Sequence, residues 1–269
     1  RHARLLLAPA GGRDGSPPAL RGRSVTIDEP VGDGAGGSRL FETRMFVVDR
    51  LGKLRTPEAV DIVTRAISDS GDLRGSATQT VQLVLRPTGG SAASYEVLSR
   101  IELKPGRYSL RAAAHARTAD KTGSVYCDID VPDYTKPRLS LSGIILSMNP
   151  GVVTAPKDAL SSLIPVVPTT LREFDRRGTL TAFARIYQGA GRPPSAVTAT
   201  VRVVDSAGRS MFESIEEIGP SRLVPGPPSS FDWKVAVPID RLREGRYLLI
   251  VEAKAGADAV RRDVRFTAR

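Results

Sequence analysis

A short phrase that occurs twice constrains the fold more than any other feature of this sequence. It reads Leu-Lys-Pro-Gly-Arg-Tyr-Ser-Leu at residues 103–110 and Leu-Arg-Glu-Gly-Arg-Tyr-Leu-Leu at residues 242–249. The glycine permits a positive φ that other residues resist, and the tyrosine opens a strand two residues later. In β-sandwiches, a tyrosine at such a corner donates its hydroxyl to a nearby backbone group and holds the turn. The residues of the two predicted corners are Gly106, Tyr108, Gly245 and Tyr247.

Alternating apolar and polar residues through most of the chain indicate strands on both sides of each corner. We therefore predict an all-β protein with two tandem immunoglobulin/fibronectin-III-like β-sandwiches and an extended N-terminal arm. A second similarity supports the prediction of two related domains, because the turn at 203–209 is similar to the turn at 47–53. The predicted parts are a Gly/Pro/Arg-rich arm at 1–38, a first sandwich at 39–146, a Pro-rich linker at 147–170 and a second sandwich at 171–269.

One segment of the first sandwich permits two interpretations. Thr56 and Pro57 resemble a helix start, and Val60 and Ile67 would then share one helical face, which predicts a short helix over 57–68. The alternative is a strand, because apolar and polar residues also alternate there.

Composition limits the classes of function. The chain has 39 basic and 29 acidic residues, a net charge of +10, but only 5% aromatic residues. The basic excess is spread over the chain, so we expect weak attraction to anionic surfaces and no nucleic-acid binding. No stretch is long and apolar enough to cross a bilayer. Because the chain begins with Arg1, we expect a processed or partial chain, with any signal peptide or anchor upstream.

Residues able to carry chemistry are few. The two histidines, His2 and His115, fall in the arm and on the outer face of a strand. Cys127 alternates with apolar residues, which indicates a buried thiol without a reactive role. The carboxylates gather in two groups, at 128–130 and 213–217, and solvated strand faces explain both better than a weak calcium site does. We predict no enzyme, no cofactor and no metal site.

Two strands carry apolar residues on the face that should be polar. In the strand at 246–254, Leu248 and Ile250 oppose the core-facing set, and in the strand at 178–187, Phe183 and Tyr187 do the same. Either another part of the chain covers these four residues or they form a contact with a partner protein.

Several short motifs resemble the C-terminal half of von Willebrand factor A-related proteins, which are common in acidobacteria. The resemblance implies an exported protein and covers residues 75–269, without the A domain; the Asp-x-Ser-x-Ser metal signature of that domain does not occur. The motifs are Leu98-Ser99-Arg100-Ile101, Gly123-Ser124-Val125-Tyr126, Val131-Pro132-Asp133-Tyr134, Leu141-Ser142-Gly143-Ile144, Leu171-Arg172-Glu173-Phe174, Ala184-Arg185-Ile186-Tyr187 and Arg262-Asp263-Val264-Arg265-Phe266.

Three hypotheses of function remain from the sequence. The leading one is a non-catalytic, exported structural or interaction module that binds protein partners or itself, as an accessory or scaffold subunit of a cell-envelope or extracellular assembly. The alternative is a carbohydrate- or polyanion-binding module that uses surface aromatic residues and arginine clusters. The third is a fragment of an enzyme whose catalytic domain lies upstream.

Overall fold

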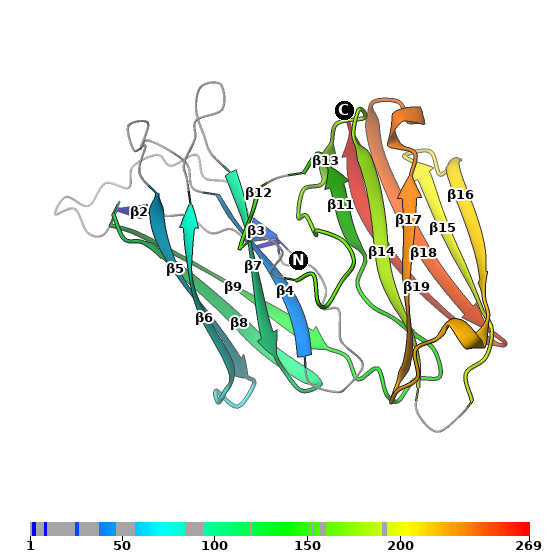
Figure 1. Ribbon diagram of the computed structural model, residues 1–269, viewed down its shortest axis with the longest axis horizontal. Coiled ribbons are helices and arrows are strands. Elements are labelled where there is room, and N and C mark those ends of the chain that lie inside the picture. The colour runs from blue at the N-terminus through cyan, green and yellow to red at the C-terminus, as the bar shows by residue number, and fades with distance from the viewer. Residues whose placement is uncertain are drawn as a thin grey trace. The chain divides into compact units, whose positions relative to one another are not determined.

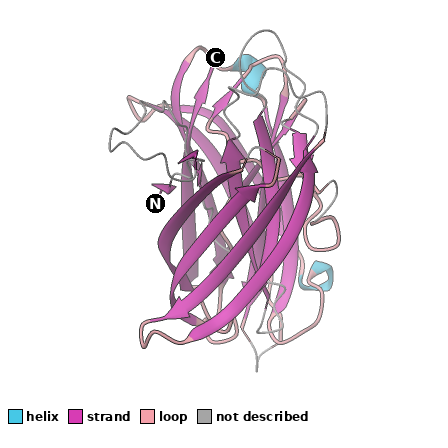
Figure 2. Cartoon of the chain, turned by 90° about the vertical axis from the view of Figure 1, so that its left-hand side faces the viewer, coloured by secondary structure: helices cyan, strands magenta, loops and turns pink. Residues whose placement is uncertain are grey.

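The fold is almost entirely β-strand (Figure 2). The computed structural model describes residues 2–3, 8–9, 25–26, 38–46, 57–83, 94–118, 120–151, 153–156, 160–189 and 193–269. The only helices in these ranges are two 3-10 turns, η1 at Pro220–Arg222 and η2 at Ile239–Arg241. The predicted all-β class is confirmed. In these same ranges, no helix has the length and apolar character needed to span a membrane.

The chain divides into two compact units. In the part that the structure describes, unit 1 comprises residues within 1–27, 40–131 and 152–160, and unit 2 those within 28–39, 132–151 and 161–269. Each unit has a five-stranded sheet and a smaller sheet (Figure 1).

The larger sheet of unit 1 has the strand order β2-β9-β8-β5-β6 and the smaller sheet the order β12-β7-β4. Neighbours in the larger sheet are antiparallel, whereas β12 runs parallel to β7. A further two-stranded pair joins β1 to β3. The bounds are β1 His2–Ala3, β2 Ala8–Pro9, β3 Val25–Thr26, β4 Ser38–Phe46, β5 Glu58–Ser68, β6 Leu73–Leu83, β7 Ser94–Glu102, β8 Gly106–Ala116, β9 Lys121–Val131 and β12 Val153–Ala155.

The helix predicted over 57–68 is wrong and the alternative strand is correct, because these residues form β5. Val60, Ile62 and Ala66 point inward and are at most 3% exposed, while Arg65 between them points to solvent. Strand β5 hydrogen-bonds along its length to β6 on one side and to β8 on the other. Pairing with two neighbours satisfies the backbone groups of the segment and buries its period-2 face, and this outweighs a helix-start signal that is only local.

In unit 2 the larger sheet has the order β13-β19-β18-β15-β16, and in the smaller sheet β14 lies between β17 and the pair β10 and β11. The bounds are β10 Ser140–Leu141, β11 Ile145–Asn149, β13 Glu173–Phe174, β14 Thr179–Gln188, β15 Val197–Asp205, β16 Ser210–Ile218, β17 Ser229–Val237, β18 Gly245–Ala255 and β19 Asp258–Ala268. Buried side chains of both sheets form one core, and Trp233 in that core is 3% exposed.

The predicted boundary at residue 146 is displaced. The sequence predicts that the first sandwich extends to residue 146, but β10 and β11 pair with β14 in unit 2. Ser142 interrupts them, since its Oγ accepts a hydrogen bond from the Arg185 backbone N–H at 2.8 Å. Conversely, β12 lies inside the predicted linker and joins the smaller sheet of unit 1. Alternation shows that a segment is a strand, but it does not show which sheet the strand joins.

Both corners have the same geometry. The Tyr108 hydroxyl donates to the Lys104 carbonyl oxygen at 2.9 Å, and the Tyr247 hydroxyl donates to the Arg243 carbonyl oxygen at 2.8 Å. Gly106 and Gly245 have φ values of +152° and +157°. A Cβ at either glycine would lie at 3.5 Å or more from its neighbours, so backbone strain rather than lack of space favours glycine here.

We predict that removing the Tyr247 hydroxyl with Tyr247→Phe lowers the free energy of unfolding by about 1 kcal/mol, the net worth of one hydrogen bond. Gly245→Ala should cost about 1–3 kcal/mol, because alanine is strained at this φ. Urea denaturation of the full chain measures both changes.

Matched controls are Tyr126→Phe, at a tyrosine that is 74% exposed, and Gly219→Ala, at a glycine with φ −67°. If the control substitutions lower the free energy of unfolding as much as the corner substitutions do, the proposed role of the two corners is contradicted.

Candidate functional site

Phe183 and Tyr187, predicted as partner contacts, lie on β14 and point away from the core of unit 2. They are nevertheless 1% and 0% exposed. The ring of Tyr134, from the same unit, stacks on Tyr187 with ring centroids 4.3 Å apart. Tyr187 is therefore covered by the chain itself, which is one of the two interpretations drawn from the sequence, and Phe183 on the same face is buried as well.

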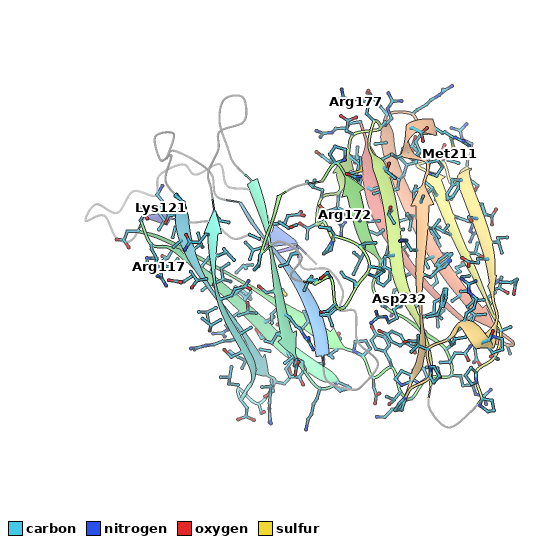
Figure 3. All side chains as sticks on the ribbon, viewed as in Figure 1. Arg117, Lys121, Arg172, Arg177, Met211 and Asp232 are labelled. Atoms are coloured by element: carbon cyan, nitrogen blue, oxygen red, sulfur yellow. The ribbon has the colours of Figure 1, made fainter. Side chains whose placement is uncertain are left out.

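A charged group near the same two residues holds the loop that follows residue 160 in place. The Arg185 guanidinium, whose side chain is only 12% exposed, binds the carboxylate of Asp232 on β17 (Figure 3 labels Asp232). Its Nη2 also donates to the Leu163 carbonyl oxygen at 2.8 Å. One side chain thus connects β14, β17 and the loop that follows residue 160.

Leu248 and Ile250, the other two predicted contacts, lie on the outer face of the larger sheet. Leu248 is half-buried and Ile250 is 6% exposed. In the strand register, Ile250 lies between Arg202 and Asp263. These two positions place charged side chains on both sides of Ile250, so the apolar pair does not form an open patch.

The histidine, cysteine and aspartate side chains that could carry chemistry do not come together as a reactive group in the described part of the chain. His115 Nε2 lies 3.3 Å from Asp120 Oδ1 at an exposed turn. Cys127 is partly buried against the unit-1 core, and Asp130 forms an exposed ion pair with Arg107 at 3.1 Å. Within the ranges that the structure describes, no three His, Cys, Asp or Glu side chains come together as metal ligands. The side chain of His2 lies outside the described residues.

An open feature of unit 2 is β16, which lies at one edge of its larger sheet. Its inner side pairs with β15, and no other described strand pairs with its outer side. Met211 and Ile215 are 42% and 63% exposed (Figure 3 labels Met211), and Glu213 and Glu217 share their face. The strand therefore presents free backbone groups beside alternating apolar and acidic side chains.

Glu216 holds the opposite face of β16 to the other sheet. Trp233 Nε1 on β17 donates to Glu216 Oε2 at 2.8 Å, and Arg222 Nη1 binds Glu216 Oε1 at 2.7 Å. Arg222 also lies over the ring of Phe231, 4.7 Å from its centroid. The hydrogen bond from Arg222 lowers the pKa of Glu216.

The edge strand β6 of unit 1 is a weaker candidate. Its outward residues are mostly polar, among them Ser76, Thr78 and Thr80, and its one exposed large apolar residue is Leu73 at the end of the strand. Alternation in the sequence indicates strands, but it does not show that β16 lies at an edge, because sheet order depends on pairings between distant segments.

Comparisons with known proteins do not assign a family. No protein-family model matches the chain, and no curated protein matches it. Solved structures with some likeness include a Parabacteroides merdae β-glucuronidase (12% identity, TM-score 0.31) and Bacteroides uniformis β-glucuronidase 2 (8% identity, TM-score 0.31). The match covers 99% and 98% of this chain, but only 34% and 31% of those proteins. At these TM-scores the likeness carries no argument about function.

Two exposed aspartates have strongly lowered pKa values. Hydrogen bonds from Arg117 at 2.7 and 2.8 Å, with a further one from Thr80, lower the pKa of Asp61 from 3.8 to about 2. Hydrogen bonds from the side chain and backbone of Arg177 lower the pKa of Asp175 to about 2 as well. One such pair lies in each unit.

We predict that Arg117→Gln raises the titration midpoint of Asp61 from about 2 toward 3.8, measured by carboxyl ¹³C NMR, and leaves Asp175 at about 2. Because the folded pKa is the lower one, the stabilisation is complete above pH 3.8 and disappears as the pH falls toward 2. An Asp61 midpoint that does not change in the variant would contradict this assignment.

Proposed function

We propose that this chain is a non-catalytic interaction module, and that β16 binds an extended segment of a partner protein as an additional strand. The observation that carries the proposal is the free outer side of β16, nine residues long, with Met211 and Ile215 exposed on it. In binding by strand addition, backbone hydrogen bonds supply affinity and alternate side chains supply specificity.

The composition of β16 indicates the kind of segment it accepts. Alternate residues of an added strand would lie opposite Met211, Glu213, Ile215 and Glu217. Opposite charges and apolar pairs directly across strands contribute about 0.2–1 kcal/mol each. We infer a partner strand that carries Lys or Arg at two alternate positions, with apolar residues at the positions between them.

The same side chains disfavour indiscriminate pairing. Glu213 and Glu217 place negative charge on the edge strand, and an irregularity in its register opposite Val203/Val204 distorts one end of it. Charged side chains and bulges are both features by which natural edge strands avoid aggregation. Pairing with a second copy of β16 would gather carboxylates on one face. We therefore infer a different protein as the partner rather than self-association.

The finer class of the fold and the location of the protein are parts of the proposal. The order β16-β15-β18-β19, opposite a layer built on β14, fits the larger sheet and opposing layer of an immunoglobulin/fibronectin-III-like sandwich. We also propose export to the cell envelope or beyond, which rests on the resemblance to von Willebrand factor A-related proteins.

The test begins with gentle purification of the chain from its own cells and native mass spectrometry. A partner that recurs at fixed stoichiometry is identified, purified and bound again to the full chain in calorimetry. We predict that Ile215→Lys, which places a cation on the binding face, weakens this binding at least 10-fold.

The matched control is Val224→Lys, at an equally apolar residue of the same unit that is 65% exposed and lies outside β16. We expect this variant to bind within 2-fold of the unsubstituted chain. Equal losses in both variants, or a chain that is always recovered alone, would overturn the proposal.

A further inference from the structure

Two arginines lie directly opposite each other on the outer face of the larger sheet of unit 1. Arg65 on β5 pairs with Arg111 on β8, and both side chains are exposed. Neither guanidinium makes a hydrogen bond or an ion pair with any residue that the structure describes. Like charges at directly opposed positions destabilise a sheet, so this pair costs stability rather than contributing to it.

Other charged residues on the same face are neutralised by partners. Arg117 Nε binds Asp61 at 2.7 Å, and Arg107 binds Asp130 at 3.1 Å. Asp128 lies opposite Ser109, one outward position along from Arg111. The Arg65–Arg111 pair therefore stands out as two adjacent cations without an anion.

An exposed aromatic ring continues the row. Tyr126 on β9 is directly opposite Arg111 and is 74% exposed, and Ser76 on β6 is directly opposite Arg65. Four neighbouring strands thus present Ser76, Arg65, Arg111 and Tyr126 in one line. At about 4.8 Å between strands, the row is roughly 14 Å long, which matches a short run of sugar rings.

On one side of this row the neighbouring positions carry short side chains. Val63 and Ala113 are the next outward residues on the two central strands, with Thr78 and Ser124 outside them. None of these side chains is long enough to cover a guanidinium, so a ligand reaches both arginines from solvent.

We propose that this row binds an acidic polysaccharide, with a carboxylate or sulfate group held between Arg65 and Arg111 and a sugar ring lying on Tyr126. The planar guanidinium forms two parallel hydrogen bonds with such an oxyanion, and the anion removes the repulsion within the arginine pair. An aromatic face is a suitable surface for the apolar face of a pyranose ring. This activity goes beyond the proposed strand addition and uses a different unit.

The test measures binding of the full chain to soluble polymers by affinity electrophoresis and calorimetry. Polygalacturonate supplies carboxylates, dextran sulfate supplies sulfates, and unmodified dextran supplies neither. We expect binding to at least one of the two charged polymers, which identifies the oxyanion, and binding to dextran at least 10-fold weaker. Added salt should weaken the binding.

The decisive comparison uses two double variants with the same loss of charge. Arg65→Gln with Arg111→Gln should weaken binding at least 10-fold, and Tyr126→Ala at least 3-fold. Arg261→Gln with Arg265→Gln, at two exposed arginines of unit 2, should change it less than 2-fold. Circular dichroism and urea denaturation confirm that each variant is folded.

Three results would overturn the proposal. Equal losses of affinity in the two double variants would show that the polymer is attracted by net charge alone. If neither charged polymer binds, the proposed acidic polysaccharide is not a ligand of this row. Tighter binding to single-stranded RNA than to both polysaccharides, with the same dependence on Arg65 and Arg111, would assign the row to nucleic acid instead.

Discussion

The hydrogen bond from each corner tyrosine to the carbonyl group four residues earlier is the constraint on which both units depend. It holds the turn that leads into β8 in unit 1 and into β18 in unit 2. Each of these strands pairs with a neighbour on both sides. Because a slip of one residue would turn every side chain to the other face, a corner that sets the start of a central strand also sets the register of its neighbours.

Much of the fold could be predicted from local sequence, and the errors of that prediction have a physical cause. Alternation placed Tyr108 and Leu110 on the buried face of β8, where they are 8% and 0% exposed. Local signals failed at 57–68, where pairing on both sides of β5 outweighs the helix-start residues. They also failed at the predicted boundary at residue 146, which places β10 and β11 in the wrong unit. Both errors concern partners distant in sequence, which a local pattern does not specify.

The candidate site was harder to predict than the fold. The sequence placed Phe183 and Tyr187 correctly on the face opposite the core, but it gave no sign that Tyr134 would cover Tyr187. The open surfaces lie elsewhere, on β16 and around Arg65 and Arg111. Their significance comes from strand order and register: β16 matters because it is last in its sheet, and the two arginines matter because β5 and β8 place them opposite each other.

The central claim is that this module holds a partner protein by adding a strand at β16, and hydrogen exchange of the backbone amides tests it most directly. Mass spectrometry would follow exchange in the full chain with and without its purified partner. The account predicts that binding slows exchange within Ser210–Ile218 and leaves the edge strand Leu73–Leu83 of unit 1 unchanged. A partner that binds while exchange in β16 stays the same would contradict it.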